Sequence, residues 1–255
     1  MRFATFNILN GRAPTDQHVR LDGLVEAVKR LDADVLALQE VDHNQHRSEN
    51  ADLTAIAAEA MGAGEHRFVA ALAGSHGATG PTWVAATGEE HPDSAAYGIA
   101  LLSRYPVHGW EVVRLPPVPV PVPMRFGGRL RPYWVRDEPR VAMMAVVETP
   151  RGLVTVVNTH LSFIAWWNGR QLRRVVSSTV ERSRPVVLMG DLNMGPQRAV
   201  RLTGLRPAAS HLTFPVQSPT EQLDHILVGG GLVPSGSEAP ALAVSDHRAL
   251  SVDLA

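Results

Sequence analysis

Strand-length apolar runs alternate with helix-spaced apolar positions at the start of the chain. Residues 3–9 alternate loosely between apolar and polar side chains, and residues 34–42 form a continuous apolar run that closes with Gln39 and Glu40. Both segments predict strands, the second of them buried. Asp16 is the expected N-cap of a helix between them. The apolar positions of this helix are Leu21, Leu24, Val25, Val28 and Leu31. A strand, a helix and a strand in succession predict helices layered on a sheet.

The rest of the chain continues with more strands and two more helices. A second amphipathic helix covers residues 53–61 and ends at Gly62, and a third begins at the expected cap Asn168. A turn with Pro and Gly at 149–152 predicts a hairpin between the strands that flank it. We expect the strand at 109–115 to pair with the strand that precedes it. The predicted strands are 67–73, 83–86, 97–103, 109–115, 140–148, 153–158, 185–189, 222–228 and the C-terminal segment.

Residues 116–139 interrupt this pattern. Their prolines alternate with valines and cannot donate the hydrogen bonds of a central strand, which predicts an extended surface excursion. The arginines that follow, together with Tyr133 and Trp134, would suit an anionic substrate with apolar or stackable parts. A loop packed on the surface, with Asp137 and Glu138 neutralising some arginines, needs no ligand and is the simpler interpretation. The arginines are Arg125, Arg129, Arg131, Arg136 and Arg140.

Polar side chains follow the predicted strands where they end. The clearest case is Gly-Asp-Leu-Asn at 190–193, directly after the apolar run 185–189. In open α/β folds ligands bind at this edge of the sheet, where an Asp can orient water and an Asn can hold an anion. Gly, Asp and Asn also favour plain turns, which is the alternative. The strand-end residues are Asn7, Glu40, Asn158, His160, Asp191, Asn193, Asp224, Asp246 and His247. Carboxylates, amides and imidazoles together indicate a site for a hard cation and a phosphate.

The loop at 43–50 follows one of these strand ends. It lies close enough in sequence to Glu40 for His43, His46 and Arg47 to touch a substrate there. A solvated loop explains the same residues without a ligand, and it is the simpler interpretation.

The composition removes several classes of protein and site. The chain has 255 residues, 45% of them hydrophobic, which is enough for a large core, and we expect one domain over residues 1–255. With 24 basic and 25 acidic residues, it lacks the bulk positive charge of a protein that coats nucleic acid. It has no cysteine, which excludes disulfides, thiolate metal sites and a cysteine nucleophile.

Targeting and membrane signals are also missing from the sequence pattern. Residues 1–3 run directly into a strand-like segment, and no apolar run reaches the length of a membrane span. A cytoplasmic protein is therefore the default expectation, and the oligomeric state stays open.

A series of short motifs recurs in order along nearly the whole chain. They are Thr5-Phe6-Asn7, Leu38-Gln39-Glu40-Val41, residues 98–103, Asn158-Thr159-His160-Leu161, Gly190-Asp191-Leu192-Asn193, Leu223-Asp224-His225 and Ser245-Asp246-His247. Each motif is weak by itself, but the ordered set resembles the endonuclease/exonuclease/phosphatase family, which includes pancreatic deoxyribonuclease, inositol polyphosphate 5-phosphatases and neutral sphingomyelinases. The resemblance implies an α/β (α+β) four-layered sandwich, in which two packed mixed β-sheets are flanked by helices.

The same resemblance implies a division of roles among the strand-end residues. Glu40 is similar to the family's principal metal-binding carboxylate, with Asn7 and Asp246 near the same Mg²⁺ or Mn²⁺ ion. Asp191 resembles the base that orients the attacking water, and Asn193 resembles the residue that holds the attacked phosphate.

The histidines complete this set. His160 and His247 resemble the two histidines that grip phosphoryl oxygens, and Asp224 would orient His247. Arg140 and Asn158 are expected to contact the substrate.

The implied activity is a divalent-metal-dependent phosphoesterase that hydrolyses a phosphodiester or phosphomonoester by in-line attack of water. A small or lipid-derived phosphate is the expected substrate, because the net charge is near zero and the aromatic run 163–167, with Trp166 and Trp167, would form an apolar lip. That run would equally suit the core. A DNA or RNA nuclease, with arginines along a phosphate backbone, is one alternative. A non-catalytic phosphate-binding module on the same fold is another.

Overall fold

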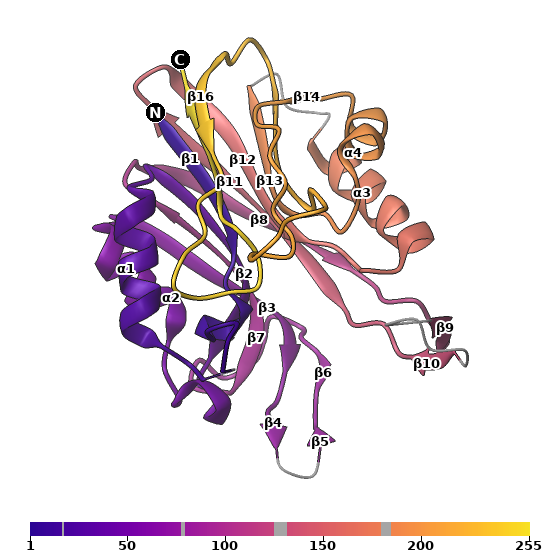
Figure 1. Cartoon of the computed structure of the whole chain (residues 1–255). Coiled ribbons are helices and arrows are strands. Elements are labelled where there is room, and N and C mark those ends of the chain that lie inside the picture. The colour runs from indigo at the N-terminus through magenta and orange to yellow at the C-terminus, as the bar shows by residue number, and fades with distance from the viewer. Residues whose placement is uncertain (17, 78–79, 125–131, 180–184) are drawn as a thin grey trace.

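Two mixed β-sheets packed face to face form the centre of the molecule (Figure 1). The computed structural model describes residues 1–16, 18–77, 80–124, 132–179 and 185–255. The N- and C-termini lie close together, because the first and last strands are hydrogen-bonded neighbours. The predicted sandwich of two packed mixed sheets is therefore confirmed.

The first sheet has seven strands, and its only parallel pair among the described residues is β1 with β2. Its strand order is β16 (Pro234–Glu238), β17 (Leu250–Leu254), β1 (Arg2–Asn7), β2 (Val35–His43), β7 (Ala96–Ser103), β3 (Glu65–Ala73) and β6 (Val84–Ala85). The parallel pair consists of the two strands predicted at the start of the chain, and α1 connects them.

The second sheet has six strands, with β12 and β13 parallel. Its order is β14 (Arg206–Pro207), β15 (Asp224–Gly229), β13 (Val186–Asp191), β12 (Gly152–His160), β11 (Arg140–Thr149) and β8 (Val107–Leu115). The hairpin predicted around the turn at 149–152 is the β11–β12 pair. The predicted pairing of 97–103 with 109–115 is wrong, because the chain crosses from the first sheet to the second between β7 and β8.

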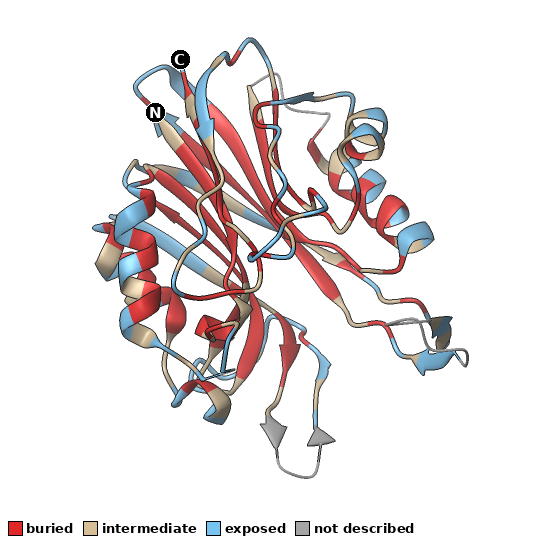
Figure 2. Ribbon diagram, in the orientation of Figure 1, coloured by how far each residue is buried: buried red, intermediate tan, exposed pale blue. Residues whose placement is uncertain are grey.

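Helices cover the outer face of each sheet, which gives four layers. They are α1 (Leu21–Leu31) and α2 (Leu53–Met61) on the first sheet, and α3 (Ala165–Thr179) and α4 (Pro196–Thr203) on the second. One apolar cluster fills the space between the sheets, a second joins the first sheet to α1 and α2, and a third joins the second sheet to α3. Figure 2 shows the helices buried on the side facing the sheets and exposed on the other. Short 3₁₀ turns occur at Leu9–Gly11 and His46–Ser48.

Two helix starts differ from the sequence prediction. Asp16 is not the N-cap of α1, which begins after Arg20; its carboxylate accepts the backbone N–H of His18 and pairs with the Arg20 side chain instead. Asn168 lies inside α3 and is buried, since the aromatic residues before it already belong to the helix.

The fourth helix, α4, was not predicted, although its ends carry ordinary signals. Gly195 is its N-cap, Pro196 occupies its first turn, and Gly204 ends it in the left-handed conformation with a φ of 69°. Proline at the start and glycine just past the end are typical of helices.

Two small two-stranded ribbons extend from the end of the sandwich that lies opposite the chain termini (Figure 1). One pairs β4 (His76–Gly77) with β5 (Gly80–Pro81), and the other pairs β9 (Val122–Met124) with β10 (Tyr133–Val135). The second ribbon belongs to the predicted excursion at 116–139, of which residues 125–131 lie outside the described residues. Trp134 in this ribbon is 71% exposed. Within the described ranges, no helix is both long and apolar enough to cross a membrane.

Candidate active site

Strand register brings the polar strand ends of both sheets together. In the second sheet, Asp191 at the end of β13 lies opposite His160 of β12 on one side and Asp224 of β15 on the other. In the first sheet, Asn7 at the end of β1 lies opposite Gln39 of β2. The two sets meet because the sheets pack face to face with these edges at the same end of the sandwich.

A bulge in β2 brings Glu40 to this end of the sandwich. The pairing of β2 with β7 skips Glu40 between Gln39 and Val41, and its φ of 54° is left-handed. An extra residue of this kind interrupts the alternation of side chains between the two faces of the sheet, so its own side chain points in a different direction. Asn7 then donates from Nδ2 to Oε1 of Glu40 at 3.1 Å and to Oδ2 of Asp191 at 3.2 Å, so one amide joins the carboxylates of the two sheets.

Gly190 allows β13 to approach its neighbour closely just before Asp191. A Cβ at this position would lie 1.9 Å from the carbonyl oxygen of Thr159, and the φ of Gly190 is +139°, so no other residue fits without strain. After the strand, the backbone N–H of Asn193 donates to Oδ1 of Asp191 at 2.9 Å. The Asn193 side chain donates to the carbonyl oxygen of Leu161 at 2.9 Å, which holds it beside the same carboxylate.

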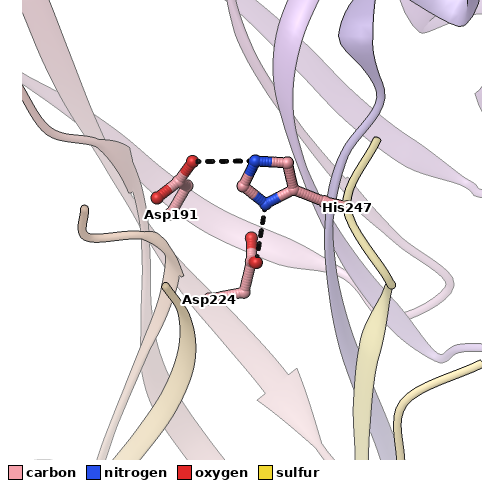
Figure 3. A group of neighbouring side chains, drawn as sticks. All are labelled: Asp191, Asp224 and His247. Carbon is pink, nitrogen blue, oxygen red and sulfur yellow. Dashed lines mark hydrogen bonds and ion pairs between the residues drawn. The ribbon is translucent and has the colours of Figure 1, made fainter. Parts of the chain in front are cut away.

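His247 lies between two carboxylates (Figure 3). Its Nδ1 is 2.8 Å from Oδ2 of Asp224, and its Nε2 is 3.8 Å from Oδ2 of Asp191. Burial by itself would lower the pKa of His247, but Asp224, Asp191 and Asp246 outweigh it and raise that pKa to about 10. The ring is therefore an imidazolium at neutral pH, with both N–H groups directed at carboxylates.

Asp191 is almost completely enclosed, with 1% of its surface exposed. Burial, followed by the charge of Asp224, raises the pKa of Asp191 to about 7, against the opposing charge of His247. A carboxyl group with a pKa near neutrality exchanges protons readily at physiological pH, which is what a general base requires.

His160 is held on the other side of Asp191 by Arg140. Nη1 of Arg140 lies 3.1 Å from Nδ1 of His160, and Nε2 of His160 lies 3.5 Å from Oδ2 of Asp191. Because a guanidinium can only donate, a hydrogen bond from Arg140 makes Nδ1 of His160 the acceptor and places the proton of a neutral ring on Nε2, beside Asp191 and 3.3 Å from the Asn193 side-chain amide nitrogen, which is also a donor. Burial, and then the charges of Arg140 and His247, hold the pKa of His160 well below its usual range.

The other predicted residues take different places around this cluster. Asp246 is half-buried and close enough for its charge to raise the pKa of Glu40, after the larger effect of burial. Asn158 is fully buried between the sheets, where it donates to the carbonyl oxygens of Leu38 and Ala100 and accepts from Gln39. We interpret Asn158 as a link between the sheets, and Arg140, at 6% exposure, as a support for His160.

The donor atoms of the site fit a divalent cation. Asp191, Asp224 and His247 lie with potential ligand atoms within 4.8 Å of one another, but the His247 imidazolium has no free lone pair, which leaves the carboxylates; Oδ1 of Asp224 is buried without a hydrogen-bond partner among the described residues. Glu40 and Asp246 form a second acidic set, in which two negative charges repel each other without a cation. Oxygen-rich sets of this kind suit a hard ion such as Mg²⁺ or Mn²⁺.

A pocket of about 490 Å³ opens beside Glu40. Its wall includes Arg47, which donates to Oδ2 of Asp42 from Nε at 2.8 Å and to Oδ1 from Nη2 at 2.7 Å. Arg47 also lies over the ring of Trp83, with its Cζ 5.1 Å from the ring centroid. The interpretation of 43–50 as merely a solvated loop is therefore incomplete, since Arg47 lines the pocket that Glu40 lines. His43 and His46 are not among the residues that line it.

The chain is similar to a known family in sequence and to solved structures in fold. The model of a family described as "Endonuclease/Exonuclease/phosphatase family" matches residues 4–247. A comparison with curated proteins gave no match.

Several solved structures share the fold. An endonuclease/exonuclease/phosphatase from Beutenbergia cavernae has a TM-score of 0.69 at 22% identity, over 100% of this chain and 71% of that one. A mannosyl-6-phosphatase from Bacteroides thetaiotaomicron has a TM-score of 0.66 at 16% identity, over 100% and 99%. Sphingomyelinase C from Streptomyces griseocarneus has a TM-score of 0.58 at 17% identity, over 99% and 98%. At these identities the likeness concerns the fold.

Proposed function

Because the chain belongs to the endonuclease/exonuclease/phosphatase family, whose members hydrolyse phosphate esters with a divalent metal, we propose that it hydrolyses a small or lipid-derived phosphate ester by in-line attack of water. The observation that carries this proposal is Asp191, a buried carboxylate with a pKa of about 7, held between two histidines and two amides. We take residues 1–255 as the single domain that performs the reaction.

Asp191 is the base in this proposal. Hydrogen bonds from the Asn193 backbone and the Asn7 side chain fix the plane of its carboxylate, so its remaining lone pairs point in a set direction. It accepts a proton from the attacking water. Asn193 places its side-chain amide next to the same water and next to the attacked phosphoryl group.

His247 and His160 provide the donors for the phosphoryl oxygens. Asp224 keeps His247 charged, so that an N–H and a positive charge stand beside the phosphorus as negative charge develops in the transition state. His160 stays neutral and offers its Nε2 proton, because Arg140 occupies the acceptor at Nδ1.

Glu40, with Asp246 and Asn7, would hold the divalent cation, which supplies charge neutralisation at the phosphoryl and leaving-group oxygens. Asn7 faces Glu40 through Nδ2, while its Oδ1 accepts the backbone N–H of Leu9 at 3.2 Å. Binding through Asn7 would therefore use the second lone pair of that oxygen.

A substrate panel with matched variants tests the proposal. Plasmid DNA, RNA, sphingomyelin, inositol phosphates and nitrophenyl phosphate esters are assayed with Mg²⁺, Mn²⁺ or a chelator. We expect turnover of at least one small or lipid-derived ester, loss of that turnover with chelator, and roughly a 10³-fold lower kcat in Glu40→Gln. Glu26→Gln, an exposed acid on α1, is the matched control. Unchanged turnover in both Glu40→Gln and Asp191→Asn would falsify the enzymatic proposal and leave the phosphate-binding module.

A nuclease is the second candidate within the same chemistry. The net charge of −1 favours a compact substrate over a long phosphate backbone. Binding of a DNA duplex with an affinity that falls steeply with salt, together with cleavage, would favour the nuclease instead.

A further inference from the structure

The pocket beside Glu40 contains arginines that the proposed hydrolysis of a phosphate does not use. It is lined by the arginines Arg12, Arg47 and Arg136, by the rings of Trp83 and Tyr97, and by three acids. The acids are Glu40, Asp137 and Glu138. Whether the pocket attracts an anion depends on which of these charges are already neutralised.

Two of the three acids are engaged within the protein. Asp137 is buried, and its Oδ2 accepts the backbone N–H of Val118 at 2.9 Å while its Oδ1 accepts the hydroxyl of Ser162 at 2.6 Å. Glu138 lies 3.5 Å from Nη2 of Arg140. The third acid, Glu40, belongs to the proposed cation site. Among the described residues none of these three acids forms an ion pair with Arg12 or Arg136, and their oxygens are engaged elsewhere in the protein or assigned to the proposed cation.

Two of the three arginines have no carboxylate partner among the described residues. Arg47 is neutralised by Asp42. Arg12 contacts only neutral oxygens, with Nε 3.4 Å from the Leu9 carbonyl oxygen and Nη2 3.2 Å from Oδ1 of Asn10. Neither Arg12 nor exposed Arg136 makes an ion pair with a carboxylate in the part of the chain that the structure describes. Two guanidinium groups in one pocket are thus available to an anion.

The position of the pocket indicates which part of a substrate enters it. Asn7 Nδ2 lies between Asp191 on one side and Glu40 on the other, and the pocket opens on the Glu40 side. In an in-line displacement the attacking water and the leaving group occupy opposite sides of the phosphorus. With the water at Asp191, the leaving group departs toward the pocket.

We infer that the pocket binds an anionic group on the leaving-group side of the substrate, through Arg12 and Arg136. The substrate class is then a phosphate ester whose leaving group carries a second anion, either a phosphate or a carboxylate. Trp83 lines the same pocket, with the Arg47 guanidinium 5.1 Å from its ring centroid. The inference rests on the proposed phosphoesterase activity, and it adds a requirement that the activity alone does not impose.

Two substrate pairs test this inference. The first pair is 4-nitrophenyl phosphate and its 3-carboxy derivative, and the second pair is the methyl diesters of both. Release of nitrophenol is followed with Mg²⁺ for the wild type, Arg12→Gln, Arg136→Gln, and Arg201→Gln on α4 as a control that loses the same charge. Comparing each variant with the wild type on both members of a pair cancels the difference in leaving-group reactivity.

We expect Arg12→Gln and Arg136→Gln to lower kcat/KM about tenfold on the carboxylated substrate and less than twofold on the parent, because each removes one charged hydrogen bond to the second anion. Arg12→Lys should keep most of the preference, which separates lost charge from a disturbed loop. The product 5-hydroxy-2-nitrobenzoate should inhibit Arg136→Gln about tenfold more weakly than the wild type. Arg201→Gln should behave as the wild type.

The failures are distinguishable. Equal effects of the arginine variants on both members of a pair, with hydrolysis intact, overturn the inference and leave the proposed function standing. Hydrolysis of none of the four esters by the wild type, with either Mg²⁺ or Mn²⁺, contradicts the proposed function, and the inference falls with it.

Discussion

The strand-end cluster around Asp191 and the pocket beside Glu40 are neighbours built in different ways. In the cluster, Asp191, Asp224, His160 and His247 are all at most 7% exposed, and strand register fixes three of them directly. In the pocket, most lining residues lie on loops and short turns, although Glu40, Leu72 and Tyr97 belong to strands, and the side chain of Arg47 is 23% exposed. The difference indicates that the proposed chemical step depends on the sheets, whereas the choice of substrate depends on loops that can vary without disturbing them.

This contrast predicts different effects for variants in the two regions. A change in the cluster should affect all substrates alike, because every substrate meets the same base and the same histidines. A change in the pocket should affect substrates unequally.

Asp191→Asn should cause the largest loss. It removes the proposed base while keeping a side chain of the same shape, so kcat should fall about 10³- to 10⁴-fold on every substrate that the wild type turns over. Steady-state assays on at least two substrates provide the measurement. A loss confined to one substrate would place Asp191 in recognition and break the contrast.

Asp224→Asn should cost about 100-fold in kcat, because it acts through His247. Without the carboxylate, the pKa of His247 falls from about 10 toward its ordinary value, so the imidazolium is lost as pH rises through that lower pKa. The deficit relative to the wild type should therefore grow between pH 6 and pH 9. A pH–rate profile checks this, and a deficit that is independent of pH would argue for a purely structural effect.

Arg47→Met should lower stability by about 2 kcal/mol, because Asp42, whose side chain is fully buried, loses its bidentate partner while Arg47 itself is partly exposed. Urea denaturation measures the effect. Combining Arg47→Met with Asp42→Asn should cost less than Arg47→Met alone, since no uncompensated charge remains. An equal cost would mean that the ring contacts of Arg47, rather than its ion pair, stabilise the wall.

Trp166→Ala should have the smallest effect. Trp166 is 52% exposed, whereas its neighbour Trp167 donates from Nε1 to the carbonyl oxygen of Pro116 at 2.8 Å. We expect less than about 0.5 kcal/mol of lost stability and unchanged kcat/KM on soluble esters. A selective loss on sphingomyelin in vesicles would add this aromatic run to the substrate-selecting regions.

The layered fold follows from the sequence because its signals are local. Apolar runs and helix-spaced positions predict the strands and helices, and polar residues at the strand ends predict which edge carries the site. Pairing between strands is not local. The strands at 97–103 and 109–115 follow each other closely, yet the first pairs with β2 and β3 in one sheet and the second with β11 in the other.

The site, like the fold, is predictable where its signals are local and not where they are distant in sequence. The grouping of Asp191, Asp224 and His247 is predictable, since Asp191 ends a strand, Asp224 begins its antiparallel neighbour and His247 lies just before the last strand. The place of Arg47 is not predictable, because it depends on a hydrogen bond to Asp42 and on a contact with Trp83, which is distant in sequence. The role of Asn158 is equally hidden in the sequence. A polar residue at a strand end gives no indication that its amide crosses to the opposite sheet.

The hydrogen bonds that the Asn158 side chain makes to the opposite sheet limit how the two sheets can move. Asn158 bonds to backbone carbonyls of β2 and β7 at 3.0 and 2.7 Å, so sliding one sheet over the other would leave three buried polar groups unpaired. We therefore expect the two sheets to move as one rigid body. Substrate entry and product departure fall to the loops around the pocket, on the nanosecond-to-microsecond timescale of loop motion. Backbone amides of β2 and β12 should accordingly exchange with deuterium only through global unfolding, while those at 44–50 exchange through local opening.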